Sequence, residues 1–498
     1  MNHLIIAPIV LPAILAALIV LTARTSFAAQ RLIAAAGVVI LLGLCAMLLH
    51  QSGTMPPQAY FLGNWPAPFG IVLILDRLSA LMLALTAGLS AVIWLFVIAT
   101  KWDKRGKHFH ALFLFQLMGL NGAFLTGDAF NLFVFFEVLL IASYGLMVHG
   151  GGADRLRAGV QYVAFNLVGS TLFLFGLATI YSVTGTLNMA DLAVKIAQLP
   201  SGDAALIRVA AVMLLLVFAV KGALVPLHFW LPGTYANAPG PVAALFAVMT
   251  KVGAYAVIRF GTLIFGAQAT AGLWDSLLTP AALATMAVGA FGVLGSQSLT
   301  RMVAFAGIGS MGVVFLAIAA GTAQATSAAL YYMLHSTLAT ATLFLLTDLI
   351  TSRRSSDDLR NPTAPIAQSG LIGALFLAAA IAMAGMPPLS GFVAKLLVMD
   401  ALRSDAAALW SAILLASLIT ILGFARAGSQ LFWKTHAVGP AHTGRKIPMA
   451  AAPIFTLLAA LAALTIFAGP ITAWLEITAQ SLYAPGNYIA ANALPGAP

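Results

Sequence analysis

The sequence predicts an all-α polytopic membrane protein of about 14 transmembrane helices, with two inverted five-helix repeats and interrupted helices 7 and 12. Two observations carry the fold class. Hydrophobic residues make up 61% and charged residues 8% of the 498 residues, whereas soluble domains are roughly half apolar and a quarter charged. Apolar stretches long enough to cross a bilayer also follow one another along the chain, with short connections between them.

The helices are predicted one by one from stretches of roughly 18 or more mainly apolar residues. These stretches cover residues 4–22, 31–49, 71–99, 108–125, 128–149, 158–183, 206–225, 240–262, 279–296, 302–320, 326–350, 368–399, 407–432 and 450–474. The first is not expected to be a signal peptide, because Arg24 and Arg31 follow its apolar residues, whereas a signal peptide carries its positive charge before them. We expect it to remain as the first transmembrane helix.

The basic residues are unevenly divided between the two sides of the predicted bundle. Sixteen of the 24 Lys and Arg fall at the odd-numbered connections: Arg24, Arg31, Lys101, Lys104, Arg105, Lys107, Arg155, Arg157, Arg301, Arg353, Arg354, Arg360, Arg426, Lys434, Arg445 and Lys446. Only Lys195, Arg208, Arg259 and Arg403 lie toward the other side. The positive-inside rule then predicts a multi-pass protein of a bacterial inner membrane, with both termini on the non-cytoplasmic side. The net charge of +10 therefore needs no nucleic-acid partner.

Three lysines and one glutamate lie deep within predicted helices. Lys221 precedes Pro226 by five residues, and Lys251 and Lys395 lie well inside apolar stretches. Glu137, one of only two glutamates in the chain, lies near the middle of the fifth stretch. Such groups cost at least ~2.5–3.5 kcal/mol each and usually face a bundle interior or a wet path. Two alternatives stay open: a lysine near a helix end can reach the interface, and buried charges can merely lock helices together.

Two proline-rich segments interrupt the pattern beside these lysines. "PLHFWLPGTYANAPGP" follows Lys221, and "AGMPPLSGFVAK" ends on Lys395. Proline opens the helical hydrogen-bond ladder, which in lipid is tolerated only where protein or water satisfies the freed groups. Two interrupted helices in corresponding places of two halves indicate inverted repeats and an ion pathway. The predicted units are helices 1–3 (residues 1–107), a first repeat (108–265), a second repeat (266–435), and a last helix with its tail (436–498).

Three long strings carry a family resemblance. "FFEVLLIASYGLM", "KGALVPLHFWLPGTYANAPGPVAALFAVMTKVGAYAVIRF" and "AGMPPLSGFVAKLLV" resemble the antiporter-like subunits shared by respiratory complex I, membrane-bound hydrogenases and multisubunit Mrp cation/proton antiporters. The resemblance covers about residues 70 to 430. It implies fourteen core helices, inverted five-helix repeats and a lateral row of charges through the membrane centre.

The same resemblance implies roles for the four deep charges. Glu137 is similar to the fifth-helix glutamate of the family, and Lys221 to its seventh-helix lysine partner. Lys251 is similar to the central lysine of the eighth helix, and Lys395 to the ionisable residue of the twelfth. Lysine suits such a row because its charge responds to burial and to nearby carboxylates, whereas arginine stays charged.

Within this superfamily the chain most resembles the D-type subunit of the multisubunit Mrp antiporters. Lys395 stands where the M-type subunit of complex I has glutamate, and no long lateral helix or large extension follows the last predicted span. "LYYMLHSTLATATLFLLTDLI" keeps His335 but has Ala339 where the broader family often has a lysine. A basic relay at position 339 is therefore not expected.

Histidines add candidates of lower specificity. A single histidine on a helix is usually a packing residue, but its ability to titrate near neutral pH suits proton transfer, and the resemblance places His335 between Lys251 and Lys395. His228, in the first proline-rich segment, is a weaker candidate of the same kind. His108 and His110 lie near three lysines without a cysteine or carboxylate cluster, so they are expected to be solvated, with no metal bound.

The function implied is a proton-translocating subunit of a hetero-oligomeric monovalent cation/proton antiporter, which moves protons along a buried Glu/Lys/His row coupled to Na+ or K+ efflux. It is a secondary transporter subunit rather than an enzyme. Expected partners are other subunits of the complex, membrane lipid, protons and monovalent cations; no cofactor is expected. The alternative is a proton-pumping membrane subunit of an NADH-quinone oxidoreductase or membrane hydrogenase, which the neighbouring genes would distinguish.

Overall fold

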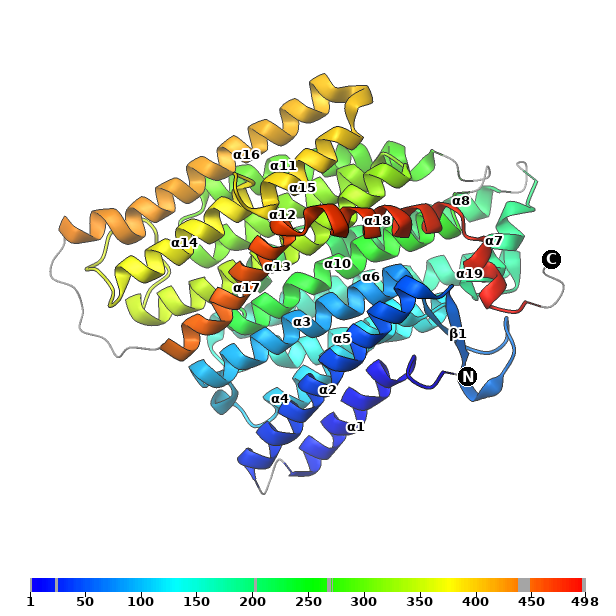
Figure 1. Cartoon of the computed structure of the whole chain (residues 1–498), viewed down its shortest axis with the longest axis horizontal. Helices are drawn as coiled ribbons and strands as arrows, with labels where there is room; N and C mark the ends of the chain where they lie inside the picture. The colour runs from blue at the N-terminus through cyan, green and yellow to red at the C-terminus, as the bar shows by residue number, and fades with distance from the viewer. Residues whose placement is uncertain are drawn as a thin grey trace.

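The computed structural model describes residues 2–22, 26–200, 204–266, 270, 272–437 and 448–494. Arg24, Arg445 and Lys446, three of the basic residues used to predict the topology, lie outside the described residues. The described chain is a helical bundle with one short hairpin, and its helices run roughly along the long axis of the molecule (Figure 1).

The elements follow one another with short connections. The helices are α1 (Ala7–Thr22), α2 (Phe27–Thr54), α3 (Arg77–Thr100), α4 (Phe109–Leu125), α5 (Ala129–Met147), α6 (Ala153–Thr184), α7 (Met189–Ala197), α8 (Ala205–Gly222), α9 (Trp230–Asn237), α10 (Gly240–Leu263), α11 (Leu273–Gly295), α12 (Leu299–Ala319), α13 (Ala323–Arg354), α14 (Ser369–Ala384), α15 (Ser390–Ala401), α16 (Ala406–Gly428), α17 (Pro448–Ile466), α18 (Ala468–Tyr483) and α19 (Gly486–Ala491). Short 3-10 segments are η1 (Leu62–Asn64), η2 (Trp102–Arg105), η4 (Arg403–Asp405) and η6 (Lys434–Ala437), and η5 (Ser429–Trp433) is a π-helical turn. Strands β1 (Gln58–Phe61) and β2 (Val72–Leu75) pair antiparallel, with Gln58 opposite Leu75.

The helices have the length and composition of membrane spans. Among the described residues, 11 helices are long and apolar enough to cross a bilayer, and α1, α4 and α14 are shorter apolar helices. The protein is therefore a multi-pass membrane protein. The start of α1, the hairpin and α19 lie at one end of the bundle, and the connection between α3 and α4 lies at the other (Figure 1).

Three predicted spans differ from the helices that form. Residues 72–75 pair as β2, and the helix begins only after Asp76, whose side chain accepts a hydrogen bond from the Ser79 amide in a capping box. The span 368–399 is divided between α14 and α15, because the Pro387–Pro388 pair cannot continue a helix. The span 450–474 is divided at Phe467, and the residues after it form α18 and α19. Hydropathy predicted the apolar length of these segments, but it did not predict the strand at residues 72–75 or the two helix breaks.

The interruption after Lys221 is closed by protein groups. α8 ends at Gly222, and Ala223 adopts a left-handed conformation with φ 55°. The indole of Trp230 donates to the Val220 carbonyl at 2.9 Å, and the Thr285 hydroxyl accepts from the Val225 amide at 2.9 Å. The Thr285 bond satisfies a backbone amide that the helix no longer pairs, as a bilayer interior requires, and the Trp230 bond adds a second donor to the Val220 carbonyl, which also accepts the Ala223 amide.

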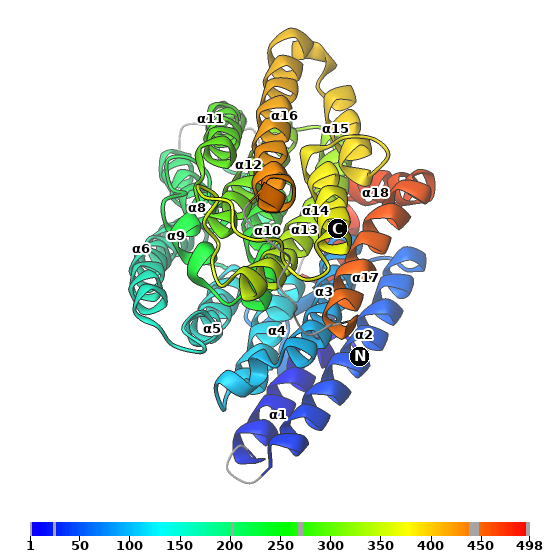
Figure 2. The same cartoon turned by 90° about the vertical axis from the view of Figure 1, so that its left-hand side faces the viewer.

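Helices α10, α12 and α13 form the centre of the molecule. Figure 2 shows α10 and α13 in the middle of the bundle, with α5 and α6 on one side and α15 and α16 on another. Every residue of the apolar window of α10 is buried, and most of α12 and α13 is buried as well. α18 packs along α13 and α10 and covers part of this core (Figure 1).

Two ion pairs hold distant parts of the chain together near the ends of the bundle. Arg259 on α10 donates to both oxygens of Asp76, at 2.6 and 2.8 Å, and both side chains are buried. Such a pair fixes both partners, because removal of either one would leave an uncompensated buried charge.

At the other end, the structure corrects the expectation that both neighbouring histidines are solvated. His108 is exposed, but His110 is buried and hydrogen-bonds Asp103 at 3.3 Å, while Arg31 donates to the same carboxylate at 2.6 Å. Burial raises the pKa of Asp103, but its hydrogen bonds to His110 and Arg31 outweigh burial and hold that pKa below its usual range. The charged residues that precede His110 in the sequence did not indicate that its side chain points from α4 into the protein.

Glycines set the distance between α11 and α12. A Cβ at Gly289 would overlap the backbone of Gly309, whereas a Cβ at Gly295, at the end of the same helix, would meet open space. Small residues at such crossings let two membrane helices approach closely.

We predict that Gly289→Ala destabilises the chain by about 1–3 kcal/mol, because the added methyl must push the two helices apart. Gly295→Ala is the matched control and should leave stability unchanged or slightly higher, since alanine is the better helix former. Thermal unfolding of the detergent-solubilised complex, followed by size-exclusion chromatography, measures both. Equal melting temperatures for the two variants would show that the crossing is not tightly packed.

Candidate functional site

Glu137 and Lys221, the deep glutamate and the first deep lysine, both hydrogen-bond to side chains of α6. Glu137 lies half-buried on α5, and its carboxylate accepts a hydrogen bond from the Ser170 hydroxyl of α6. Lys221, at the C-terminal end of α8, donates to the side-chain oxygen of Asn166 at 2.9 Å. Asn166 and Ser170 are one helical turn apart on α6 and therefore share a face. Among the described residues no ion pair joins Glu137 to Lys221, so α6 provides the partners of both.

The ammonium group of Lys221 is enclosed by protein. The residue is 7% exposed, and the ammonium group lies 5.8 Å from the centre of the Phe136 ring. Its place in the last turn of α8 lets the negative end of the helix dipole favour the charged form. The alternative in which Lys221 reaches water along its own helix is therefore wrong in this structure.

Lys251 lies in the middle of α10 with a single polar contact. Its ammonium group lies 3.3 Å from the sulfur of Met311 on α12, and the residue is 1% exposed. A thioether is a weak acceptor. No carboxylate of the described chain forms an ion pair with Lys251, so nothing fixes this side chain in its charged form.

His335 and Lys395 lie at the second interruption. The Nδ1 atom of His335 is 2.9 Å from the hydroxyl of Ser390, the first residue of α15. The Lys395 ammonium donates to the Ala384 carbonyl and to the Ser417 hydroxyl, both at 2.7 Å. The proline-containing break thus supplies a free helix-end carbonyl to a buried cation, which is the arrangement typical of ion sites at broken membrane helices.

These groups lie on a continuous series of packed helices. α5 packs on α6, α6 on α8, α8 on α10, α10 on α12 and α13, and α13 on α15, which contacts α16. Each of the five groups contacts a neutral partner on a neighbouring helix. The sequence had predicted the charged members of this series but not the neutral ones: Asn166, Ser170, Met311, Ser390 and Ser417. A polar pair spaced by four residues in the apolar α6 is a sequence signal that could have identified Asn166 and Ser170.

His228 is the candidate least connected to the others. It is buried in the segment between α8 and α9, and its ring lies against Phe229 with 4.6 Å between ring centres. Its Nδ1 atom has no hydrogen-bond partner among the described residues, and no hydrogen bond within that part of the chain joins it to the lysines. The described residues contain no group of three or more His, Cys, Asp or Glu arranged to hold a metal ion.

Comparisons with known proteins agree in family and in fold. A family described as NADH:quinone oxidoreductase/Mrp antiporter, transmembrane region, matches residues 126–421. A relative named as the D-type subunit of a probable K(+)/H(+) antiporter, from Rhizobium meliloti (strain 1021), is 39% identical, with 97% of this chain and 96% of the relative covered. The D-type subunit of a Na(+)/H(+) antiporter from Bacillus subtilis (strain 168) is 37% identical, with 99% of each chain covered.

Solved structures repeat the architecture over nearly the whole chain. A chain of the Mrp complex from Dietzia sp. DQ12-45-1b superposes with a TM-score of 0.89 at 27% identity, covering 99% of this chain and 100% of that one. A chain of respiratory complex I from Thermus thermophilus superposes with a TM-score of 0.82 at 25% identity, covering 96% and 99%. The chain therefore belongs to the NADH:quinone oxidoreductase/Mrp antiporter transmembrane family, and within it to the D-type subunits of bacterial cation/proton antiporters.

Proposed function

We propose that this chain is the proton-translocating subunit of a hetero-oligomeric monovalent cation/proton antiporter. Protons move along a row formed by Glu137, Lys221, Lys251, His335 and Lys395, and their movement is coupled to Na+ or K+ efflux. The relatives named as antiporter subunits and the likeness to a chain of the Mrp complex support this class. The partners are the other subunits of such a complex, and the chain acts as a secondary transporter subunit rather than as an enzyme.

One observation carries the row: its buried lysines contact neutral groups. Lys221 contacts an amide oxygen, Lys251 a thioether, and Lys395 a carbonyl and a hydroxyl. A lysine without a direct ion pair in a low-dielectric interior passes readily between charged and neutral forms. A proton relay requires this, because each member must lose and regain a proton.

The same contacts argue against charges that only lock helices together. Where this chain does lock elements with charge, it uses direct ion pairs of arginine and aspartate, as in Arg259–Asp76 and Arg31–Asp103. The row uses lysine instead and lacks such pairs among the described residues. Arginine remains protonated under all physiological conditions, whereas lysine does not.

One observation supports the alternative of a redox-driven pump module. Chains of respiratory complex I and of an archaeal membrane-bound sulfane sulfur reductase have the same fold. In that setting the same row would move protons driven by electron transfer in other subunits. Purification of the native complex distinguishes the two: copurifying iron–sulfur subunits would favour the pump, and small membrane subunits alone would favour the antiporter.

We also propose fourteen crossings, in which α8 with α9 and α14 with α15 each form one interrupted crossing, and two inverted repeats spanning 108–265 and 266–435. Backbone pairing supports the repeats. The Ala129 amide donates to Leu187 at 2.8 Å, and the Leu299 amide donates to Asp357 at 2.9 Å. Both members of the second pair lie 170 residues after those of the first, so the start of α5 and the start of α12 are tied down in the same way. The segments 1–107 and 436–498 flank the repeats.

The charge distribution supports an inner-membrane location with both termini on the non-cytoplasmic side. Lysines and arginines gather near the connection between α3 and α4 and near the end of α13, at the end of the bundle opposite α19. This basic end is the proposed cytoplasmic side.

Glu137→Ala should reduce cation-dependent proton movement at least tenfold without preventing membrane insertion, because it removes the carboxylate of the row. Glu476→Ala, which changes the exposed second glutamate on α18, is the matched control and should behave as wild type. Everted vesicles carrying the whole complex report transport by the quenching of a pH-sensitive dye, and a native gel reports assembly. Wild-type transport by an assembled Glu137→Ala complex contradicts the role of Glu137.

Lys251→Arg should fail as completely as Lys251→Ala, because arginine keeps a positive charge but cannot release its proton. The same comparison at Lys395 should give the same order. A role in helix locking predicts the reverse, with arginine the better replacement. Initial transport rates across a range of pH values, normalised to assembled complex, separate the two. Full activity of the arginine variants with an unchanged pH profile would remove these lysines from the relay.

Topology is tested with single cysteines after the buried Cys45 has been replaced by alanine. Ser355→Cys, after α13, and Ser404→Cys, after α15, both occupy exposed positions. A membrane-impermeant maleimide should label Ser355→Cys in everted vesicles and Ser404→Cys in intact spheroplasts, because a single interrupted crossing separates the two sites. The opposite labelling pattern would invert the proposed orientation, and labelling of both from one side would remove the crossing.

A further inference from the structure

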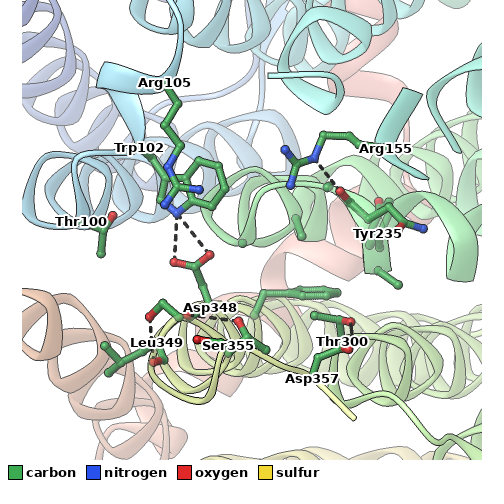
Figure 3. Close-up of a pocket in the computed structure, with 18 of the residues that line it drawn as sticks. Thr100, Trp102, Arg105, Arg155, Tyr235, Thr300, Asp348, Leu349, Ser355 and Asp357 are labelled. Carbon is green, nitrogen blue, oxygen red and sulfur yellow. Dashed lines mark hydrogen bonds between the residues drawn. The ribbon is translucent and has the colours of Figure 1, made fainter. Parts of the chain in front are cut away.

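A cavity with charged residues in its lining opens at the basic end of the bundle. It has a volume of about 920 Å³ and lies between η2, the connection of α9 to α10, and the last turns of α13. Its lining includes Lys101, Arg105 and Arg155, together with two carboxylates, Asp348 and Asp357. Figure 3 shows the Asp348 side chain pointing toward Trp102 across the space between α13 and η2.

The two carboxylates of this cavity have different surroundings. Asp357 is held by hydroxyl groups, since Thr300 donates to it at 2.6 Å and Ser298 donates to the same oxygen. Asp348 receives the indole N–H of Trp102, at 3.1 and 3.0 Å from its two oxygens, and the backbone N–H of Gly240, and it forms no ion pair among the described residues (Figure 3). Because no hydroxyl or cation within that part of the chain is bonded to it, Asp348 is the better candidate of the two for gaining and losing a proton.

The nearby arginines are engaged elsewhere. The Arg105 guanidinium lies 3.7 Å from the centre of the Trp102 ring, on which it stacks. Arg155 donates to the backbone carbonyls of Asn237 and His149, at 2.8 and 3.0 Å. Both thus build the wall of the cavity and leave Asp348 without a direct cationic partner. A carboxylate at the inner wall also opposes the binding of an anion, although the rim is basic.

A buried hydroxyl lies two turns deeper on the α13 face that carries Asp348. Thr340 is 3% exposed, and its hydroxyl has no hydrogen-bond partner among the described residues. Thr337, Thr342 and Thr351 on the same helix instead donate to the carbonyl four residues earlier. A buried polar group without a partner needs a particular explanation, and a place in a transfer path is one.

Residues of α12 connect the cavity and Thr340 with the central lysine, Lys251. Thr300 of α12 lines the cavity, Gly307 lies against Thr340, and Met311, one turn further, contacts the ammonium of Lys251. The eleven residue-to-residue steps from Thr300 to Met311 span about 16 Å at the helical rise. The cavity, the Thr340 hydroxyl and Met311 therefore lie at successive depths along α12 and α13, and Met311 contacts Lys251 of the adjacent α10.

We propose that this cavity is the port through which protons pass between the cytoplasmic solution and Lys251. Asp348 exchanges protons with water in the cavity and so alternates between carboxylate and carboxylic acid. The Thr340 hydroxyl accepts a proton from that side and releases one toward Lys251. Lys251 takes up the proton as its amine becomes ammonium, and the reverse sequence returns it. This inference rests on the proposed function of the row and adds the place where the row meets solution.

The test uses the whole complex in everted vesicles with Cys45→Ala as background. Asp348→Asn keeps an acceptor for the Trp102 indole but cannot carry a proton, so we expect the initial rate of cation-induced proton movement to fall about tenfold. Asp348→Cys should be equally slow. A methanethiosulfonate reagent that carries a carboxylate should then restore a large part of the rate, and a reagent of similar size that carries an ammonium should not.

A purely structural role of Asp348 would not be rescued according to the charge of the reagent. The proposal is overturned if assembled Asp348→Asn transports at the wild-type rate, or if both reagents have equal effects on Asp348→Cys.

Thr340 is tested against a hydroxyl of the same helix. Thr340→Val should slow proton movement several-fold, whereas Thr342→Val, which removes a hydroxyl already bonded to its own helix, should leave the rate unchanged. Equal rates for the two variants would exclude Thr340 from the port. Lys251→Ala, measured beside them, separates the two levels of inference. An inactive Lys251→Ala with a fully active Asp348→Asn rejects the port alone, and a fully active Lys251→Ala rejects the row itself.

Discussion

The cost of burying an ammonium group without a counter-ion governs this structure. Three lysines lie inside an apolar bundle, and the hydrogen-bond partners of each are neutral groups: an amide oxygen, a thioether, or a carbonyl with a hydroxyl. Weak stabilisation of the charged form lets a small change in surroundings remove or restore a proton. The broken helices also stabilise a buried ammonium group. An interruption such as the one after α14 leaves free a carbonyl that would be hydrogen-bonded within a continuous helix.

The proposed repeats differ in chemistry where their backbones agree. Ser170 donates to Glu137 in the first repeat. The positions 170 residues later are Thr340 and Gly307, which also lie against each other, but without a carboxylate. The first repeat thus holds a charge where the second holds only a hydroxyl and space. The same fold therefore carries a carboxylate, Glu137, in the first repeat and a neutral hydroxyl, Thr340, at this place in the second.

Charges at the ends of the bundle serve a different purpose from those in its middle. Arg259 with Asp76 and Arg31 with Asp103 form direct pairs that tie together segments far apart in the chain. Arginine suits this purpose because it stays charged and bonds both oxygens of a carboxylate. The lysines in the middle need the opposite property. The different uses of the two basic residues therefore follow their chemistry, with arginine at the anchoring positions and lysine at the positions proposed to titrate.

The membrane class, most of the helices, both interruptions and the deep ionisable residues could be predicted from the sequence, because hydropathy and proline act locally. The relay roles of Glu137 and the lysines stay predictions. The contacts of each group could not be predicted, because they depend on the fold: Asn166 meets Lys221 across 55 residues, and Met311 meets Lys251 across 60. The tertiary structure also decided that His110 is buried. Such contacts depend on the rotation and packing of helices about one another, which the composition of an almost uniformly apolar chain does not specify.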